Sequence, residues 1–145
     1  PTEVVSSGNK IVTKNTKFKN HDFVLSNFKF KDGALAKISA NFGCVHNHQH
    51  VIKIFGTKKT FIYDDEGARV YNKRDFNKPK FLKVKKLYNG KYCLLKKYIS
   101  LLDTSVGINL ESINKELNII NIALCAEKSL KKNKKQNIKL LKFNL

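Results

Sequence analysis

Short β-type runs separated by turn clusters fill residues 3–88, and this pattern constrains the fold more than any other feature. Residues 23–30 show the period best, because Val24, Ser26, Phe28 and Phe30 alternate with the side chains between them and so share one face of a strand. The same reasoning predicts strands at residues 3–5, 10–13, 23–30, 34–42, 51–55, 60–63, 68–71 and 81–88. The cluster Ser6-Ser7-Gly8-Asn9 is interpreted as a turn between the first two.

Asp32-Gly33 lies between two of these runs and is the strongest local hairpin signal in the chain. A two-residue loop needs positive φ at both turn residues, which Asp and Gly tolerate. The predicted register pairs Lys31 with Ala34 and places Phe30 across from Leu35. The last predicted strand, residues 81–88, carries several lysines and therefore suits the edge of a sheet.

After residue 90 the apolar period changes from two to that of a helix. One helix is expected over residues 94–102, and a second from about Glu111 to about Lys132. The apolar stripe of the second helix is predicted to comprise Ile113, Leu117, Ile120 and Leu124, with Leu130 as an optional fifth member. A terminal strand is predicted at residues 138–143. The fold class is therefore α+β, with an open, predominantly antiparallel sheet that helices cover on one face, in a single domain of residues 1–145.

The formal charge of +18 comes almost entirely from lysine, since only Arg69 and Arg74 are arginines. Nucleic-acid readers rely on arginine, whose planar fork pairs with phosphates and guanine edges. The lysines are scattered and accompany many asparagines, which is typical of a compositional bias on solvated faces. The lysine run at residues 131–135 falls at a predicted helix end, where cations are favourable. This local role and a nucleic-acid-binding tail are two alternative explanations of the run.

The three cysteines, Cys44, Cys93 and Cys125, are far apart and form no CxxC pair. This spacing indicates neither a disulfide framework nor a zinc ribbon, and it favours a reducing, cytoplasmic setting. Cys44 and Cys125 are both expected to be buried as small apolar side chains. No apolar run is long enough to cross a membrane, and no signal peptide opens the chain.

His46, His48 and His50 are the most conspicuous polar cluster. If they lie on a strand, their alternate spacing puts all three on one face, within reach of a zinc ion for neighbouring pairs. No carboxylate is close in sequence to orient a ring nitrogen, as second shells usually do. The alternatives are simple polar side chains on an exposed or cleft-facing surface, and hydrogen bonding to a substrate. We predict substrate binding by these three residues and no metal site.

Motifs for catalysis and cofactor binding do not occur in the sequence. There is no Gly-x-Ser-x-Gly nucleophile elbow, no Gly-x-Gly-x-x-Gly loop and no Gly-Lys-Ser/Thr phosphate loop. The acids of Asp64-Asp65-Glu66-Gly67 are interpreted as turn residues that bond their own backbone. We therefore predict no catalytic and no cofactor-binding residue in this chain.

Four segments in a fixed order carry a family resemblance: Asp22 to Leu25, Phe28 to Ala34, His50 to Thr57, and Ala123 to Leu130. The family members that these segments resemble typically show an Asp-led strand, then Phe-x-x-Gly-Ala, then Ile-x-Gly-Thr, and near the end a helix with Ala-x-x-x-Ser. In this order the four segments resemble the C-terminal domain of the Gfo/Idh/MocA oxidoreductases, the family of glucose–fructose oxidoreductase and inositol dehydrogenase. The sequence departs from the family at Lys58-Lys59, where members usually have a glycine.

The resemblance implies one part of a divided enzyme. In the family an N-terminal Rossmann domain binds NAD or NADP and carries the catalytic residues, whereas the C-terminal domain forms one wall of the substrate cleft. Its open sheet face often packs against another subunit. The resemblance therefore implies a parent oxidoreductase that acts on a sugar, polyol or nucleotide-sugar, a missing Rossmann domain, a homo-oligomer, and a fragment that is inactive alone.

Two other functions remain open from the sequence. The chain is interpreted alternatively as a stand-alone module that associates with itself through a sheet face. The second alternative is a lysine-driven nucleic-acid-binding domain, whose affinity would fall steeply with salt because phosphate contacts release counterions.

Overall fold

The computed structural model describes residues 1–74, 78–84, 90–103 and 110–142. It contains β1 (Glu3–Asn9), β2 (Phe23–Lys29), β3 (Leu35–Asn41), β4 (Ile52–Phe55), β5 (Thr60–Asp64), β6 (Gly67–Tyr71), β7 (Lys80–Leu82), α1 (Gly90–Asp103), α2 (Leu110–Lys132) and β8 (Gln136–Asn137). The described pairs of strands are antiparallel, so the predicted α+β class is confirmed.

The strands form two sheets rather than the one broad sheet that the sequence predicts. The first sheet has the order β3-β2-β1-β8, and the second has the order β4-β5-β6-β7. The chain divides accordingly into two compact units: unit 1 comprises residues 1–45 and 106–145, and unit 2 comprises residues 46–105. The prediction of a single domain over residues 1–145 stays a prediction.

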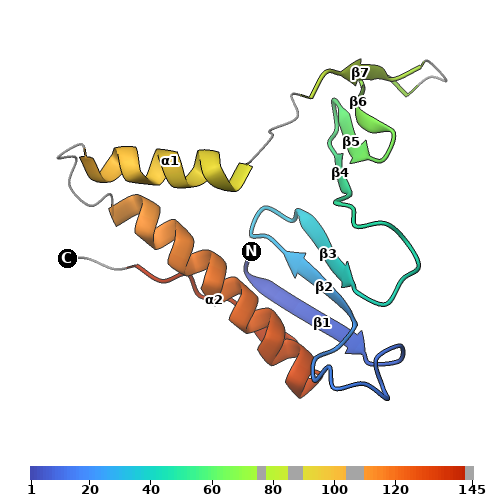
Figure 1. The fold of residues 1–145 in the computed structure, drawn as a ribbon, viewed down its shortest axis with the longest axis vertical. Coiled ribbons are helices and arrows are strands. Elements are labelled where there is room, and N and C mark those ends of the chain that lie inside the picture. Colours follow the sequence, from blue (N-terminus) through green and yellow to red (C-terminus); the bar gives the residue numbers. More distant parts are fainter. Residues whose placement is uncertain (75–77, 85–89, 104–109, 143–145) are drawn as a thin grey trace. The chain divides into compact units, whose positions relative to one another are not determined.

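In unit 1, α2 runs alongside β1 and covers one face of the first sheet (Figure 1). Val4, Phe28 and Ile138 are the buried apolar side chains of its core, and Ile122, Cys125 and Ala126 of α2 pack against them. The register Val4↔Phe28↔Ala36 places these residues on the same face, as the alternation in residues 23–30 predicts. The predicted core position of Cys125 is confirmed.

The prediction of two short strands around a turn at residues 6–9 is wrong. β1 continues through Ser6, Ser7 and Gly8, and residues 11–17 form turns and bends. Ser6 is held in the strand because its hydroxyl bonds that of Ser26 at 2.8 Å and its N–H donates to Ser129 on α2 at 2.9 Å. Gly8 allows close packing, since a Cβ there would lie 2.8 Å from the Phe23 carbonyl oxygen. Tertiary contacts thus override local turn propensity.

The predicted hairpin exists, but its loop is one residue longer than expected. The N–H of Phe30 donates to the Ala34 carbonyl at 2.9 Å, and Lys29 rather than Phe30 lies across from Leu35. Gly33 has φ of 88°, and Asp32 is not among the residues with positive φ, so the two-residue loop cannot form. Asp32 instead accepts a hydrogen bond from the Ala34 N–H at 3.1 Å.

The predicted stripe of α2 is not the face that packs on the sheet. Ile113, Ile120 and Leu124 are exposed, whereas Ile122, Cys125 and Ser129 face the first sheet. Besides Ile122, the inner face carries the smaller Cys125, Ala126 and Ser129, and the Ser129 hydroxyl lies close enough to β1 to bond the strand backbone. The predicted start near Glu111 and end near Lys132 are confirmed to within a residue.

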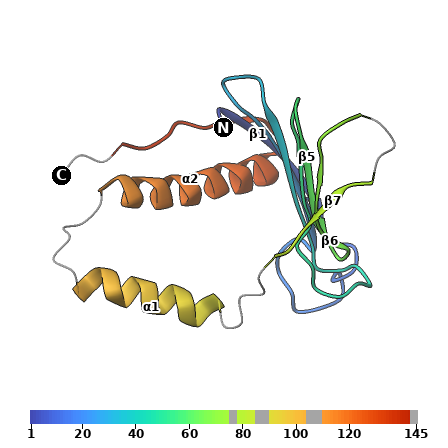
Figure 2. The same ribbon diagram turned by 90° about the horizontal axis from the view of Figure 1, so that it is seen from above.

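The terminal strand predicted at residues 138–143 is also wrong for its described part, residues 138–142. Asn133, with φ of 50°, turns the chain back, and pairing with β1 ends at Asn137. Beyond it the chain runs beside α2 (Figures 1 and 2). There the side chains of Asn118 and Asn121 bond the backbone of Leu141 and Lys139 at 2.7–3.0 Å and so replace a strand partner.

In unit 2, β7 is an edge strand of the second sheet, as its lysines predict. It is shorter than predicted: Lys83 and Val84 lie outside the strand, and residues 85–88 lie outside the described residues. α1 begins earlier than expected, at Gly90, and none of the helices in the described ranges is long and apolar enough to cross a membrane.

Candidate substrate-facing segment

Residues 42–51, here called the His connector, join β3 to β4 and contain the three predicted site histidines. Asp22 anchors the point where the connector leaves β3. The backbone carbonyl of Asp22 accepts from the Phe42 N–H at 2.8 Å, and its own N–H donates to the Asn9 carbonyl at 3.0 Å. One residue therefore ties together the ends of β1 and β3.

The Asp22 carboxylate is 2% exposed and organises the loop after β1. Its Oδ2 accepts from the Thr13 N–H at 2.7 Å and from the Thr13 hydroxyl at 3.1 Å. The backbone hydrogen bond from Thr13 is the main cause that holds the pKa of Asp22 below its ordinary value, and burial opposes it. The sequence analysis identifies Asp22 only as the start of a strand, because nothing local indicates its loop partners.

Gly43 is the first connector residue that requires glycine. A Cβ at this position would lie 2.7 Å from Val12 Cγ2, so the loop held by Asp22 packs directly on the connector backbone. The Gly43 N–H also donates to the Asn41 side chain at 2.9 Å. The expectation that Cys44 is buried is wrong: it is exposed, and its thiol lies 3.7 Å from the Asn41 carbonyl.

His46, His48 and His50 are exposed, and none of them lies on a strand. The shared face expected from strand geometry therefore does not apply. The rings of His48 and His50 meet edge to face with centroids 4.8 Å apart. Across the described ranges, no group of three His, Cys, Asp or Glu side chains is arranged to hold a metal ion.

Asp65 supplies the carboxylate that the sequence analysis did not find for these histidines. His46 Nε2 lies 3.5 Å from Asp65 Oδ2, in the turn between β5 and β6, and His46 Nδ1 lies 2.8 Å from the Asn47 carbonyl oxygen. Contacts to both ring nitrogens restrain the imidazole. The sequence does not indicate this pairing, because β4 and β5 lie between His46 and Asp65 in the chain.

Arg69 stabilises the turn that carries Asp65. It is 6% exposed, its Nη2 lies 2.5 Å from Asp64 Oδ2, and its Nη1 bonds Glu66. Asp64 Oδ1 accepts from the Glu66 N–H at 3.1 Å, which confirms the predicted backbone bond for Asp64, whereas Asp65 pairs with His46 and Glu66 with Arg69. Gly67 completes the turn with φ of 99°. Arg69 thus pairs with the acids on both sides of Asp65 and holds the turn that carries it.

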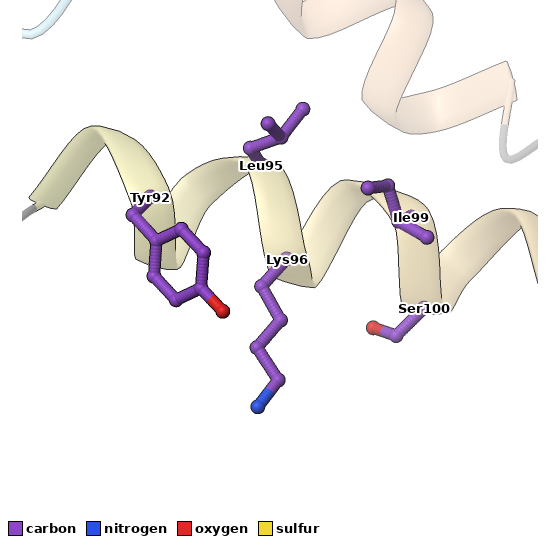
Figure 3. Close-up of a pocket in the computed structure, with 5 residues that line it drawn as sticks. All are labelled: Tyr92, Leu95, Lys96, Ile99 and Ser100. Atoms are coloured by element: carbon purple, nitrogen blue, oxygen red, sulfur yellow. The ribbon is translucent and has the colours of Figure 1, made fainter.

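A shallow hollow in unit 2 is lined by α1 alone. Figure 3 shows its residues, Tyr92, Leu95, Lys96, Ile99 and Ser100, along one side of the helix. Tyr92, Leu95 and Ile99 are about half exposed or more, and the spacing of the five residues is that of a single helix face. This hollow is a depression between side chains of a single helix and does not enclose a ligand.

Similarity to solved structures extends over nearly the whole chain. A levoglucosan dehydrogenase in complex with NADH and levoglucosan matches 97% of it, with 12% identity and a TM-score of 0.69. An oxidoreductase domain protein from Kribbella flavida matches 95%, with 15% identity and a TM-score of 0.67. The chain has the fold of a Gfo/Idh/MocA oxidoreductase domain. This agrees with the resemblance found in the sequence.

A putative NADPH-dependent oxidoreductase from Desulfitobacterium hafniense also has this fold, with 17% identity over 94% of the chain and a TM-score of 0.65. The chain spans 45%, 44% and 42% of these three structures, which is less than half of each. No protein-family model and no curated protein matches the sequence. The likeness is therefore one of fold, and over half of each similar structure lies beyond the matched region.

Proposed function

We propose that this chain is the C-terminal, substrate-binding and oligomerisation domain of an NAD(P)-dependent oxidoreductase that acts on a sugar, polyol or nucleotide-sugar. The supporting observation is that the fold matches nearly all of this chain but less than half of each oxidoreductase. A Rossmann domain outside this sequence binds the nicotinamide and carries the catalytic residues. This chain alone holds no cofactor and catalyses no reaction.

In this proposal the His connector faces the substrate. Imidazole nitrogens donate and accept hydrogen bonds, which suits the hydroxyl groups of a sugar or polyol. His46 is restrained by Asp65, whereas the rings of His48 and His50 contact only each other among the ring contacts of the described residues. His48 and His50 therefore offer their nitrogens to the ligand, and His46 orients the segment.

Calorimetric titration of the isolated chain with NADH tests whether nicotinamide binding belongs to the other domain. We expect no saturable heat, and a stoichiometric binding isotherm would overturn the proposal. In the longer chain that carries both domains, NADH binding is expected.

Substitution of the histidines tests their role in that longer chain. We expect His48→Ala and His50→Ala to raise KM for the sugar substrate about fivefold each, because one hydrogen bond contributes about 1 kcal/mol. The turnover number should change little. His21→Ala removes an exposed imidazole from another loop and serves as the matched control. An unchanged KM in both connector variants would contradict the assignment.

The second sheet offers a face for a second copy of the chain. Its register places Ile52, Ile54, Phe61, Tyr63 and Val70 on one side, and Ile52 and Ile54 are 48% and 59% exposed. We propose that homo-oligomers form through this side. Light scattering should give a dimer that Ile54→Lys dissociates and that Lys53→Glu, on the opposite face of β4, leaves intact. A strict monomer for the native chain would contradict this contact.

The cytoplasm is the proposed location. Cys44, Cys93 and Cys125 are free thiols, which suits a reducing compartment.

A further inference from the structure

Helix α2 carries two apolar faces, and the first sheet accounts for only one of them. The inner face contacts β1 and the core through Ile122, Cys125, Ala126 and Ser129. The other face, here called the outer stripe, comprises Ile113, Leu117, Ile120 and Leu124. Ile113, Ile120 and Leu124 are 39%, 56% and 56% exposed, and Leu117 is partly buried.

Helix geometry places the outer stripe away from the sheet. Successive residues are rotated by about 100° around a helix axis, so residues two apart differ by about 200°. Ile120 and Leu124 both lie two positions from Ile122, which packs against the core. Their side chains therefore project to the opposite side, where both are more than half exposed in the part of the chain that the structure describes.

The spacing of the outer stripe indicates what kind of surface covers it. Its members follow one another at intervals of four, three and four residues, which is the seam spacing of helices that pack knobs into holes. The seam ends at Glu127 and Lys131, which continue the same intervals and form an ion pair of 2.6 Å. A helix packed along this seam would bury aliphatic side chains, and at the end of the seam it would contact Glu127 and Lys131, whose opposite charges are paired.

We infer that the outer stripe is the docking surface for an apolar helix of the nucleotide-binding domain. This inference rests on the proposed function. The solved structures with this fold contain more than half of their chain outside the matched region, so a second covering layer is available in the whole enzyme. A helix with apolar residues on two sides is buried on two sides in its complete protein. A second copy of the chain is the alternative occupant, and the labelling experiment distinguishes it from the nucleotide-binding domain.

Thiol labelling at single positions tests this assignment. Ile120→Cys and Leu124→Cys are placed on the seam, and Ile119→Cys is the matched control, since Ile119 is 60% exposed on the same helix but off the seam. Maleimide modification of each is followed by peptide mass spectrometry in the isolated chain and in the longer chain with both domains. We expect the seam positions to react at least about tenfold more slowly in the longer chain, and Ile119→Cys to react equally in both.

Each other outcome overturns the inference. Equal labelling of the seam in both proteins means that no domain covers it. Protection already complete in the isolated chain means that this chain covers its own seam, and protection that grows with protein concentration means that a second copy does. NADH binding by the longer chain is measured on the same samples. If NADH binds and the seam is exposed, only this inference fails, whereas a longer chain without NADH binding defeats the proposed function.

Discussion

The hydroxyl of Ser129 on α2 accepts a hydrogen bond from the backbone N–H of Ser6 on β1 at 2.9 Å. The same hydroxyl donates to the Lys134 carbonyl at 2.8 Å, and Ser129 is fully buried. Pairing of β1 with β8 stops at Val4, so the Ser6 N–H lies beyond the last strand partner on that edge. The Ser129 side chain thus takes the place of a strand partner for Ser6 and attaches α2 to the sheet.

Ser129→Ala should therefore destabilise the chain by about 1–3 kcal/mol, because it leaves a buried N–H without a partner. Urea denaturation followed by circular dichroism measures the change. Ser39→Ala, at an exposed position of β3, is the control and should change stability by no more than about 0.5 kcal/mol. Equal losses for the two variants would contradict the role of the Ser129 hydroxyl.

Asp22 should make the stability of the chain depend on acid pH. Its pKa in the folded chain is lowered, so the ionised carboxylate stabilises the fold above its unfolded pKa of about 4. This stabilisation is lost as the pH falls through the lowered folded pKa. Asp22→Asn should flatten the pH dependence of the urea midpoint below about pH 5.

Glu111 provides the comparison for that experiment. Its pKa is also lowered, by the hydrogen bond from Lys115 and by the charge of Lys115, at an exposed site. Salt screens such a pair, so Glu111→Gln should alter the acid profile only at low ionic strength. A profile unchanged by Asp22→Asn would show that the loop contacts of Asp22 do not stabilise the fold.

Gly8→Ala should destabilise the first sheet by about 1–3 kcal/mol, the range of an overpacked site. The added Cβ would meet the Phe23 carbonyl oxygen at 2.8 Å and Leu130 Cδ1 at 3.1 Å, and the backbone oxygen cannot move without breaking the pairing of β1 with β2. Thermal unfolding measures the effect. Gly90→Ala, where a Cβ meets nothing within 4 Å, is the control. A native midpoint for Gly8→Ala would refute the close approach.

The two acids that bond Arg69 should contribute unequally. The side chain of Asp64 is 24% exposed and that of Glu66 is 79% exposed. Asp64→Asn should cost about 1–3 kcal/mol, because it weakens a partly buried charge-assisted bond. Glu66→Gln should cost no more than about 1 kcal/mol, as exposed ion pairs do. Chemical denaturation of the two variants gives the comparison, and a larger loss for Glu66→Gln would reverse the assignment.

Periodicity predicts the elements of this chain well wherever one face of a strand or helix is buried. Residues 23–30 alternate because Ser26 and Phe28 face the core, and the apolar period of α2 predicts its ends although the predicted stripe is the exposed face. Resemblance adds the fold of the whole, which short motifs in a fixed order indicate although no single motif does. Apolar periodicity and the order of short motifs can both be read along one chain, so a single sequence is enough to detect them.

Partners distant in sequence explain what could not be predicted. Ser6 to Asn9 reads as a turn by composition, but Ser129 and Ser26 hold it as a strand. The predicted apolar stripe of α2 faces outward, whereas the inner face combines Ile122 with the smaller Cys125, Ala126 and Ser129. In the candidate site, His46 meets Asp65 only after the β5–β6 hairpin has formed, and the three histidines leave the strand on which their shared face depended.

Unit 1 is built from residues 1–45 and 106–145, with β8 paired to β1. During synthesis, β1, β2 and β3 of this unit must therefore wait for α2 before their core can close. Unit 2 is complete in sequence before that moment and is free to fold first. Contacts of such long range slow folding. The edge of β1 therefore has no strand partner from the time β1 is made until residues 136–137 of β8 are made.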